Sequence, residues 1–247
     1  MHELTAQYLI RGVVAMAAAM APVACVSRTA HDGQPAAPAP ESEQAWRSLI
    51  DERLSQWSDP LGSDTAWHVE NDTIVAAEGA GEWLATNDRF ADFELVLEFS
   101  LGPGANSGVG ICAHDSGDPR YGGYEIQLVN SQGEAPSLRN GGAVFDIRAA
   151  SVMAMRPPET WNSLRVRLQG DVLNVWLNES PIHADVTLPP TALRDPFAAT
   201  DDGGRLSLQH SGRGVQFRDI RVRDLSPERP SVFSVDGAHE ARRSLER

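Results

Sequence analysis

The feature that most constrains this chain is an alternation of apolar and polar residues with a period of two. In residues 91–101 every second side chain is large and apolar, namely Phe93, Leu95, Leu97 and Phe99. Successive side chains of a β-strand point to opposite faces of a sheet, so this pattern predicts a strand with one buried face. Residues 163–169 and 171–178 repeat the pattern around Gly170 and Asp171, which predicts a tight hairpin.

The remaining segments extend this prediction. Residues 205–210 and 215–224 are expected to form a final pair of strands around the turn at residues 211–214. Only Ala45–Gln56 could hold one short helix, because no segment after it shows a long helical period. Glycine and proline interrupt the chain at short intervals. The sequence therefore predicts an all-β sandwich.

Composition and motifs exclude several classes of protein. The chain has 247 residues, with 22% charged and 41% hydrophobic, which is typical of a globular domain with tails. Its net charge of −13 argues against nucleic acid as a partner, because phosphate binding needs a basic surface. There is no Gly-rich phosphate loop, no G-x-S-x-G elbow, no HExxH and no paired CxxC motif. An acidic chain is compatible with neutral sugars or with metal cations.

The first residues are typical of an export signal. Gly12–Ala21 is an apolar run too short to cross a bilayer, and small residues precede Cys25. We therefore expect residues 1–25 to be a signal peptide of the lipoprotein type, with Cys25 anchoring the chain to a membrane. A short N-terminal helix is the alternative. The expected location is exported, either periplasmic or attached to the cell envelope.

The domain boundaries follow from composition. Residues 26–44 are rich in Ala and Pro and are expected to be a flexible linker. The folded domain is expected to span residues 45–226, and residues 227–247 to form a flexible tail. If Cys25 is removed or lipidated, Cys112 has no cysteine to pair with, so the fold must depend on its core.

The polar residues of the stretch 106–130 suggest a binding surface. Glu125 and Gln127 alternate with Ile126 and Leu128, so the two polar side chains share one face of a strand. In the preceding strand the alternation places Val109, Ile111 and Ala113 on the apolar face and Gly110, Cys112 and His114 on the other. If both strands lie in one sheet, Glu125, Gln127 and His114 line a shallow floor made roomy by Gly110.

Several segments together resemble the 3-keto-disaccharide hydrolase domain family over residues 67–225. They are Trp67-His68-Val69-Glu70, Trp83-Leu84-Ala85-Thr86, Asp92-Phe93-Glu94-Leu95, Asn106-Ser107-Gly108-Val109, Tyr124-Glu125-Ile126-Gln127, Trp161-Asn162, Leu208-Gln209-His210 and Phe217-Arg218-Asp219-Ile220. The resemblance implies a concanavalin A-like jelly roll of two antiparallel sheets, with a ligand cleft on the concave face. It also implies an exported enzyme that cleaves glycosides already oxidised to a ketone at C3. Some relatives act by elimination and some use a divalent metal.

The resemblance ranks the candidate site residues. Glu125 is the first candidate for a catalytic base or metal ligand, and a cross-strand ion pair with an arginine is the alternative. His114 and His210 are the candidates for the acid. The residues expected to bind substrate are Gln127, Asn106, Arg148 and Tyr121. The sequence does not identify which residues would bind a metal.

The sequence leaves two candidate functions. The first is an exported enzyme that cleaves 3-keto-glycosides by base-assisted elimination and hydration. The alternative is a non-catalytic, lectin-like carbohydrate-binding module of the envelope, because the fold alone does not determine the function.

Overall fold

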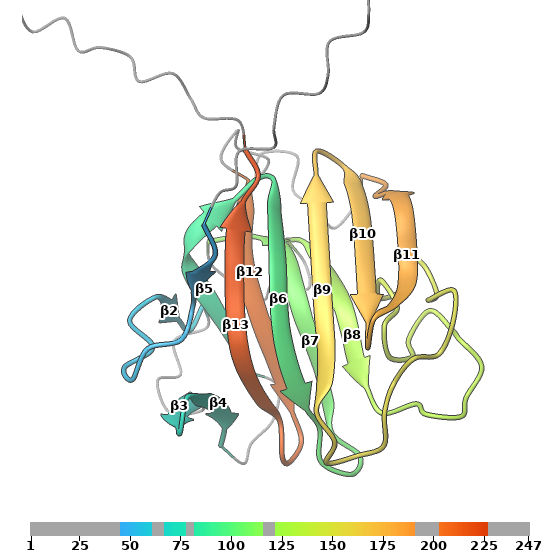
Figure 1. The fold of residues 1–247 in the computed structure, drawn as a ribbon, viewed down its shortest axis with the longest axis horizontal. Coiled ribbons are helices and arrows are strands. Elements are labelled where there is room, and N and C mark those ends of the chain that lie inside the picture. Colours follow the sequence, from blue (N-terminus) through green and yellow to red (C-terminus); the bar gives the residue numbers. More distant parts are fainter. Residues whose placement is uncertain (1–44, 61–66, 78–81, 116–121, 191–202, 227–247) are drawn as a thin grey trace, which may run out of the picture. The chain divides into compact units, whose positions relative to one another are not determined.

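A computed structural model of the chain describes residues 45–60, 67–77, 82–115, 122–190 and 203–226. All thirteen regular elements in these ranges are β-strands, and they form two antiparallel sheets (Figure 1). The structure thus confirms the all-β jelly-roll sandwich. Within the described ranges no helix has the length and apolarity needed to cross a membrane.

The larger sheet has eight strands. Seven lie in the spatial order β11 (Ser180–Thr187), β10 (Val172–Leu177), β9 (Asn162–Gln169), β6 (Phe93–Ser100), β13 (Gln216–Asp224), β4 (Thr73–Ala76) and β3 (Trp67–Glu70). The eighth, β1 (Arg47–Ser48), pairs with β13.

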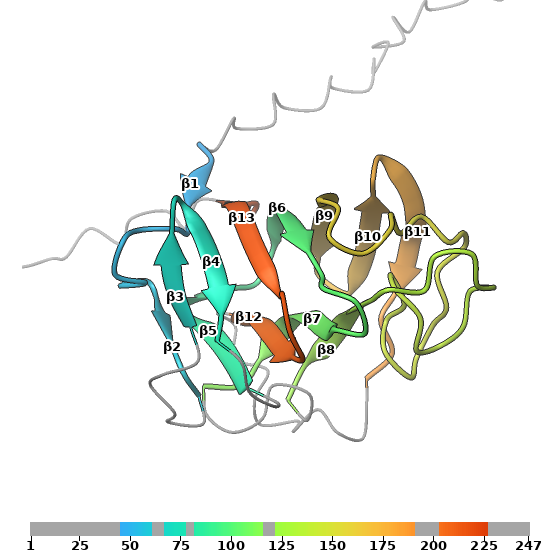
Figure 2. The same ribbon diagram turned by 90° about the horizontal axis from the view of Figure 1, so that it is seen from below.

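The smaller sheet has five strands. Their order is β2 (Trp57–Ser58), β5 (Glu82–Phe90), β12 (Gly204–Ser211), β7 (Asn106–Ala113) and β8 (Tyr124–Val129). Figure 2 shows the two layers: β13, β6, β9 and β10 lie in one, and β12, β7 and β8 in the other.

The core lies between the two sheets and contains the alternating apolar residues of both. Phe93, Leu95, Leu97 and Phe99 of β6 are each no more than 2% exposed, as the period-two pattern predicts. Val109, Ile126 and Leu208 extend the same cluster from the smaller sheet. The predicted hairpin between β9 and β10 is also present: Gln169 pairs with Val172, and Gly170 has a φ of 58°.

The prediction of a short helix at Ala45–Gln56 is wrong. This segment contains the two-residue strand β1 followed by turns. The Asp51 carboxylate accepts hydrogen bonds from the backbone N–H groups of Arg53 and Ser55, and from the Ser55 hydroxyl. Such a side chain offers the backbone an alternative to a helix. The same bonds lower the pKa of Asp51 to about 2, with the Ser55 hydroxyl as the largest cause.

The final two strands exist but do not pair with each other. β12 belongs to the five-stranded sheet and β13 to the eight-stranded sheet, so residues 211–214 pass from one sheet to the other. The expectation of a final strand pair is therefore wrong in its pairing. The two strands lie at interior positions, β12 between β5 and β7, and β13 between β6 and β4.

Candidate functional site

Strands β7 and β8 are neighbours in the five-stranded sheet and orient Glu125 and Gln127 to one face. Gly110 pairs with Glu125, and Gly108 pairs with Gln127. Ile126 lies in the core cluster on the opposite face of β8, as the sequence alternation predicts. Glu125 and Gln127 therefore lie on the face of this sheet that is turned away from the core.

The strand registers extend this face across four strands. One row runs through Trp83, Gln209, Gly108 and Gln127, and the next through Ala85, Ser207, Gly110 and Glu125. We call the surface formed by Trp83, Ser207, Gln209, Glu125 and Gln127 the polar face. Each of these five residues is at most 6% exposed. The polar face is therefore a set of desolvated polar groups on one side of a rigid sheet.

Two glycines make this arrangement sterically possible. A Cβ at Gly108 would lie 2.1 Å from Glu125 Oε1, and one at Gly110 would lie 2.1 Å from Ser207 Oγ. The carboxylate of Glu125 thus occupies the space over Gly108, and the hydroxyl of Ser207 occupies the space over Gly110. The space above these two glycines is therefore filled by polar side chains of neighbouring strands, and it does not form the roomy floor that the sequence predicts.

Three buried polar atoms of the polar face have no hydrogen-bond partner among the residues that the structure describes. They are Trp83 Nε1, Ser207 Oγ and Gln209 Oε1. Most buried polar groups of native proteins are satisfied, so a cluster of three on one face needs an explanation. Together they provide a donor, an acceptor and a hydroxyl that can do either, which suits a ligand rich in hydroxyl groups.

The edge of β8 is covered by residues 142–145, which fix its backbone. Gln127 N–H donates to Ala143 O at 2.9 Å, and Phe145 N–H donates to Glu125 O at 2.9 Å. The Gln127 side chain is held as well, because its Nε2 donates to Asn106 Oδ1 at 2.5 Å. Glu125, Gln127 and Asn106 are thus the predicted site residues that the structure brings together.

His114 does not join them, because β7 contains a bulge. Cys112 has a φ of 56°, and the pairing with β12 steps from Gly110–Ser207 to Ala113–Arg205. This extra residue exchanges the faces beyond it. The ring of His114 instead lies against Gly122, where a Cβ would be 1.9 Å from His114 Cδ2. The expectation that His114 shares a floor with Glu125 is therefore wrong.

His210 also lies away from the polar face. It pairs with Ser107, one residue out of phase with the row of Gln209 and Gly108, so it points toward the core. It is 1% exposed, and its ring meets the edge of Trp67 at 5.7 Å between centroids. The structure therefore separates His210 from Glu125 by the thickness of a sheet.

Arg148 contributes nothing to this geometry. Arg148 is exposed, and its backbone N–H donates to Val144 O at 2.9 Å. Tyr121 lies outside the described residues.

A further buried histidine, His183, is not among the residues that the sequence predicts for the site. It is 3% exposed, and its Nε2 lies 2.8 Å from Gly142 O. Burial lowers the pKa of His183.

A buried arginine closes one end of the five-stranded sheet. Arg205 is 6% exposed and donates to Asp115 O at 2.8 Å, to Ser58 Oγ at 2.5 Å and to Ala85 O at 3.1 Å. Burial lowers its pKa, and nearby Asp115 opposes that effect. Its fork of donors ties β2, β5 and β12 together, so it supports the sheet that carries the polar face.

Sequence reasoning missed Trp83, Ser207 and Gln209. Trp83 lies in the segment Trp83-Leu84-Ala85-Thr86 that carries the family resemblance, but the resemblance gives it no role in the site. The other two could have been found from the alternation of β12, in which Leu206 and Leu208 face the core and Ser207 and Gln209 therefore face away.

The residues present do not form a metal site in the described part of the chain. No group of three or more His, Cys, Asp or Glu side chains there is placed to hold a metal ion. The residues of the polar face include a single carboxylate.

Comparisons with known proteins agree with this architecture. Residues 45–223 match the profile of the 3-keto-alpha-glucoside-1,2-lyase-like domain. The fold resembles crystal structures of two candidate glycosyl hydrolases of Parabacteroides distasonis ATCC 8503, both with a TM-score of 0.60. One is 24% identical and covers 73% of this chain and 100% of its own, and the other is 21% identical and covers 74% and 95%. No curated protein matches the chain.

Proposed function

The chain belongs to the 3-keto-alpha-glucoside-1,2-lyase-like domain family, and we propose that it cleaves 3-keto-glycosides by base-assisted elimination followed by hydration. The observation that carries this proposal is the carboxylate of Glu125, 6% exposed on the polar face and seated over Gly108. Its neighbours on that face supply hydrogen-bonding groups for a carbohydrate ligand.

The chemistry starts from the ketone. A carbonyl at C3 makes the proton on C2 acidic, and a carboxylate within reach can remove it as a general base. The electron pair released at C2 forms the C1–C2 double bond as the C1–O bond breaks, and the departing oxygen takes up a proton. Water then adds across the enone, its oxygen to C1 and a proton to C2. The net change is hydrolysis of the glycosidic bond.

The residues of the polar face support three requirements of this reaction: a base, donors to the C3 oxygen, and groups that orient the sugar. Glu125 takes the base role, since it is the carboxylate of this face. Negative charge develops on the C3 oxygen, and the N–H of Trp83 and the hydroxyl of Ser207 are buried donors that can stabilise it. Gln127, held by Asn106, and Gln209 are suited to orienting the hydroxyl groups of the sugar.

We also propose that the protein is exported and that Cys25 anchors it to the cell envelope. The apolar run of residues 12–21 and the small residues before Cys25 support this proposal. Mass spectrometry of the membrane fraction would find a lipid on Cys25, and Cys25→Ala would release the protein into the soluble fraction. An unmodified Cys25 in a mature chain would reject the anchor.

The test of the activity compares cleavage of a 3-keto-glucoside by the full chain and by two variants. Glu125→Gln keeps the shape of the side chain and removes the base, so kcat/KM should fall by about 10²–10⁴-fold. Glu134→Gln, on an exposed loop residue, should leave it unchanged. A parallel series with a chelator measures any contribution of a metal.

Full activity of Glu125→Gln would remove this residue from the mechanism. If the parent chain turned over no keto-glycoside but bound unmodified glycans, the alternative of a non-catalytic carbohydrate-binding module would replace the enzyme.

A further inference from the structure

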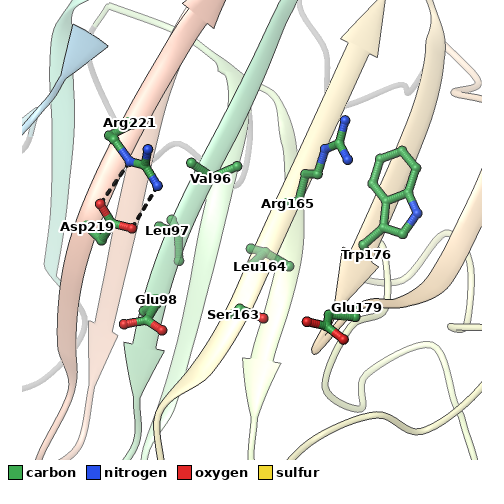
Figure 3. A pocket seen from close by; sticks show the side chains of 10 residues that line it. All are labelled: Val96, Leu97, Glu98, Ser163, Leu164, Arg165, Trp176, Glu179, Asp219 and Arg221. Atoms are coloured by element: carbon green, nitrogen blue, oxygen red, sulfur yellow. Dashed lines mark hydrogen bonds and ion pairs between the residues drawn. The ribbon is translucent and has the colours of Figure 1, made fainter. Parts of the chain in front are cut away.

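A groove of about 480 Å³ lies on the outer face of the eight-stranded sheet (Figure 3). It is formed by β6, β9, β10 and β13, and its side chains include Val96, Glu98, Ser163, Arg165, Trp176 and Arg221. The polar face belongs to the other sheet, so the proposed reaction uses none of these residues. A groove of this size is within the range of small-ligand sites.

Trp176 supplies the aromatic surface of this groove. Its neighbours Val175 and Leu177 are buried in the core, so the indole points outward, where it is half-buried. Figure 3 shows the indole broadside, between Arg165 and Glu179. An indole offers a broad apolar surface together with a polar N–H, and this combination suits a ring that has apolar C–H faces and polar edges.

The polar groups around Trp176 are held in place by ion pairs. Arg165 pairs with the buried carboxylate of Glu94, and its guanidinium carbon lies 4.6 Å from the centroid of the Trp176 ring system. Arg221 pairs with Asp219 at 2.8 Å. Side chains that are already ordered lose less entropy when a ligand binds.

The same pairs decide the charge of the ligand. Arg221 is matched by Asp219 and Glu98 by Arg218 at 2.6 Å, whereas Arg165 shares the carboxylate of Glu94 with Arg223. The exposed Glu179 balances the positive charge that this sharing leaves. The charges around the groove therefore cancel, and a neutral ligand with many hydroxyl groups finds both donors and acceptors there.

We propose that this groove binds a neutral oligosaccharide, with one sugar ring stacked on Trp176 and its hydroxyl groups bonded to Arg165, Arg221 and the adjacent carboxylates. The site is non-catalytic and separate from the polar face. It would hold the protein on a glycan while the other sheet acts on its own substrate.

The test measures binding of neutral hexasaccharides (cellohexaose, xylohexaose, mannohexaose and maltohexaose) to the full chain. Calorimetry gives the Kd, and NMR of the ¹⁵N-labelled indole groups identifies the tryptophan that responds. Trp176→Ala should weaken binding of at least one of these sugars tenfold or more, and Trp176→Phe should retain most of it. Leu138→Ala, which alters an exposed apolar residue outside the groove, should have no effect.

Two results would overturn the proposal: no binding of any of the four sugars at millimolar concentration, or binding that survives Trp176→Ala. Glu125→Gln and cleavage of the 3-keto-glucoside separate the two sites. Trp176→Ala should leave cleavage unchanged, and Glu125→Gln should leave hexasaccharide binding unchanged. Loss of sugar binding in Glu125→Gln alone would assign the sugar to the polar face and reject the groove.

Discussion

Gly108→Ala should disable the proposed base without removing any group that takes part in the reaction. The added methyl group would stand 2.1 Å from Glu125 Oε1 and 2.8 Å from both Cδ and Cγ, and Cβ atoms essentially never approach other atoms closer than 3.0 Å. The carboxylate must therefore retreat by about 1 Å. A displacement of that size costs about 10²-fold in rate, or about 2.7 kcal/mol of transition-state stabilisation.

The assay is kcat/KM on a 3-keto-glucoside, with thermal unfolding measured in parallel. Overpacking of this kind costs about 1–3 kcal/mol of folding stability, so the variant should remain folded at the assay temperature. Gly110→Ala is the comparison: its methyl group would crowd Ser207 Oγ and the ring of Trp83. It should also reduce the rate, because it crowds the two donors assigned to the C3 oxygen, but that loss should persist once Glu125→Gln has removed the base.

A double-mutant cycle decides whether Gly108 acts through Glu125. Once Glu125→Gln has removed the base, adding Gly108→Ala should cost little more, because residues that act as a unit are not additive. Full activity of Gly108→Ala, or losses that multiply in the double variant, would refute the reasoning.

Three further predictions concern stability and activity. Glu94 is 1% exposed between Arg165 and Arg223, so Glu94→Gln should lower the free energy of unfolding by about 3 kcal/mol. Glu98→Gln is the control and should cost under about 1 kcal/mol, because the Glu98 side chain is 35% exposed. Equal shifts of the two variants in denaturant midpoint would contradict this. Burial lowers the pKa of His183, so on acidification the unfolded chain binds a proton that the folded chain does not. The free energy of unfolding should therefore fall as the pH drops below about 6.5. Urea titrations at successive pH values should show a weaker pH dependence for His183→Gln. Trp83→Phe removes a buried N–H without a described partner, so it should lower kcat and kcat/KM for the keto-glycoside by about tenfold while changing stability by under about 1 kcal/mol. An unchanged kcat/KM would remove Trp83 from the site.

Much of this fold could be predicted from the sequence because a period of two is a geometric property of strands. The alternation of β8 correctly separates Glu125 and Gln127 from Ile126 and Leu128. The same rule fails at His114, because the left-handed conformation of Cys112 inserts a residue that alternation alone does not reveal. Bulges have weak sequence signals when the residue is not glycine.

The other errors have different causes. His210 has the same parity as Leu208, so the pattern itself could have placed it toward the core. The family resemblance suggests His210 as a candidate acid and takes no account of the face of the sheet on which its side chain lies. The pairing of β12 with β13 was mistaken because a four-residue connection is as compatible with a hairpin as with a crossing between sheets. The polar face could not be predicted as a whole, because it depends on the registers of four paired strands and no local sequence pattern contains them.

The positions of β12 and β13 have a consequence for the biogenesis of the protein. Each sheet has an interior strand that comes from the last part of the domain, residues 204–211 and 216–224. Neither sheet can close until these residues have left the ribosome, so the earlier strands have unfilled gaps throughout synthesis. Such late, non-local pairing delays folding. For a chain proposed to be threaded through a membrane before it folds, this order of assembly would itself keep the nascent polypeptide competent for translocation.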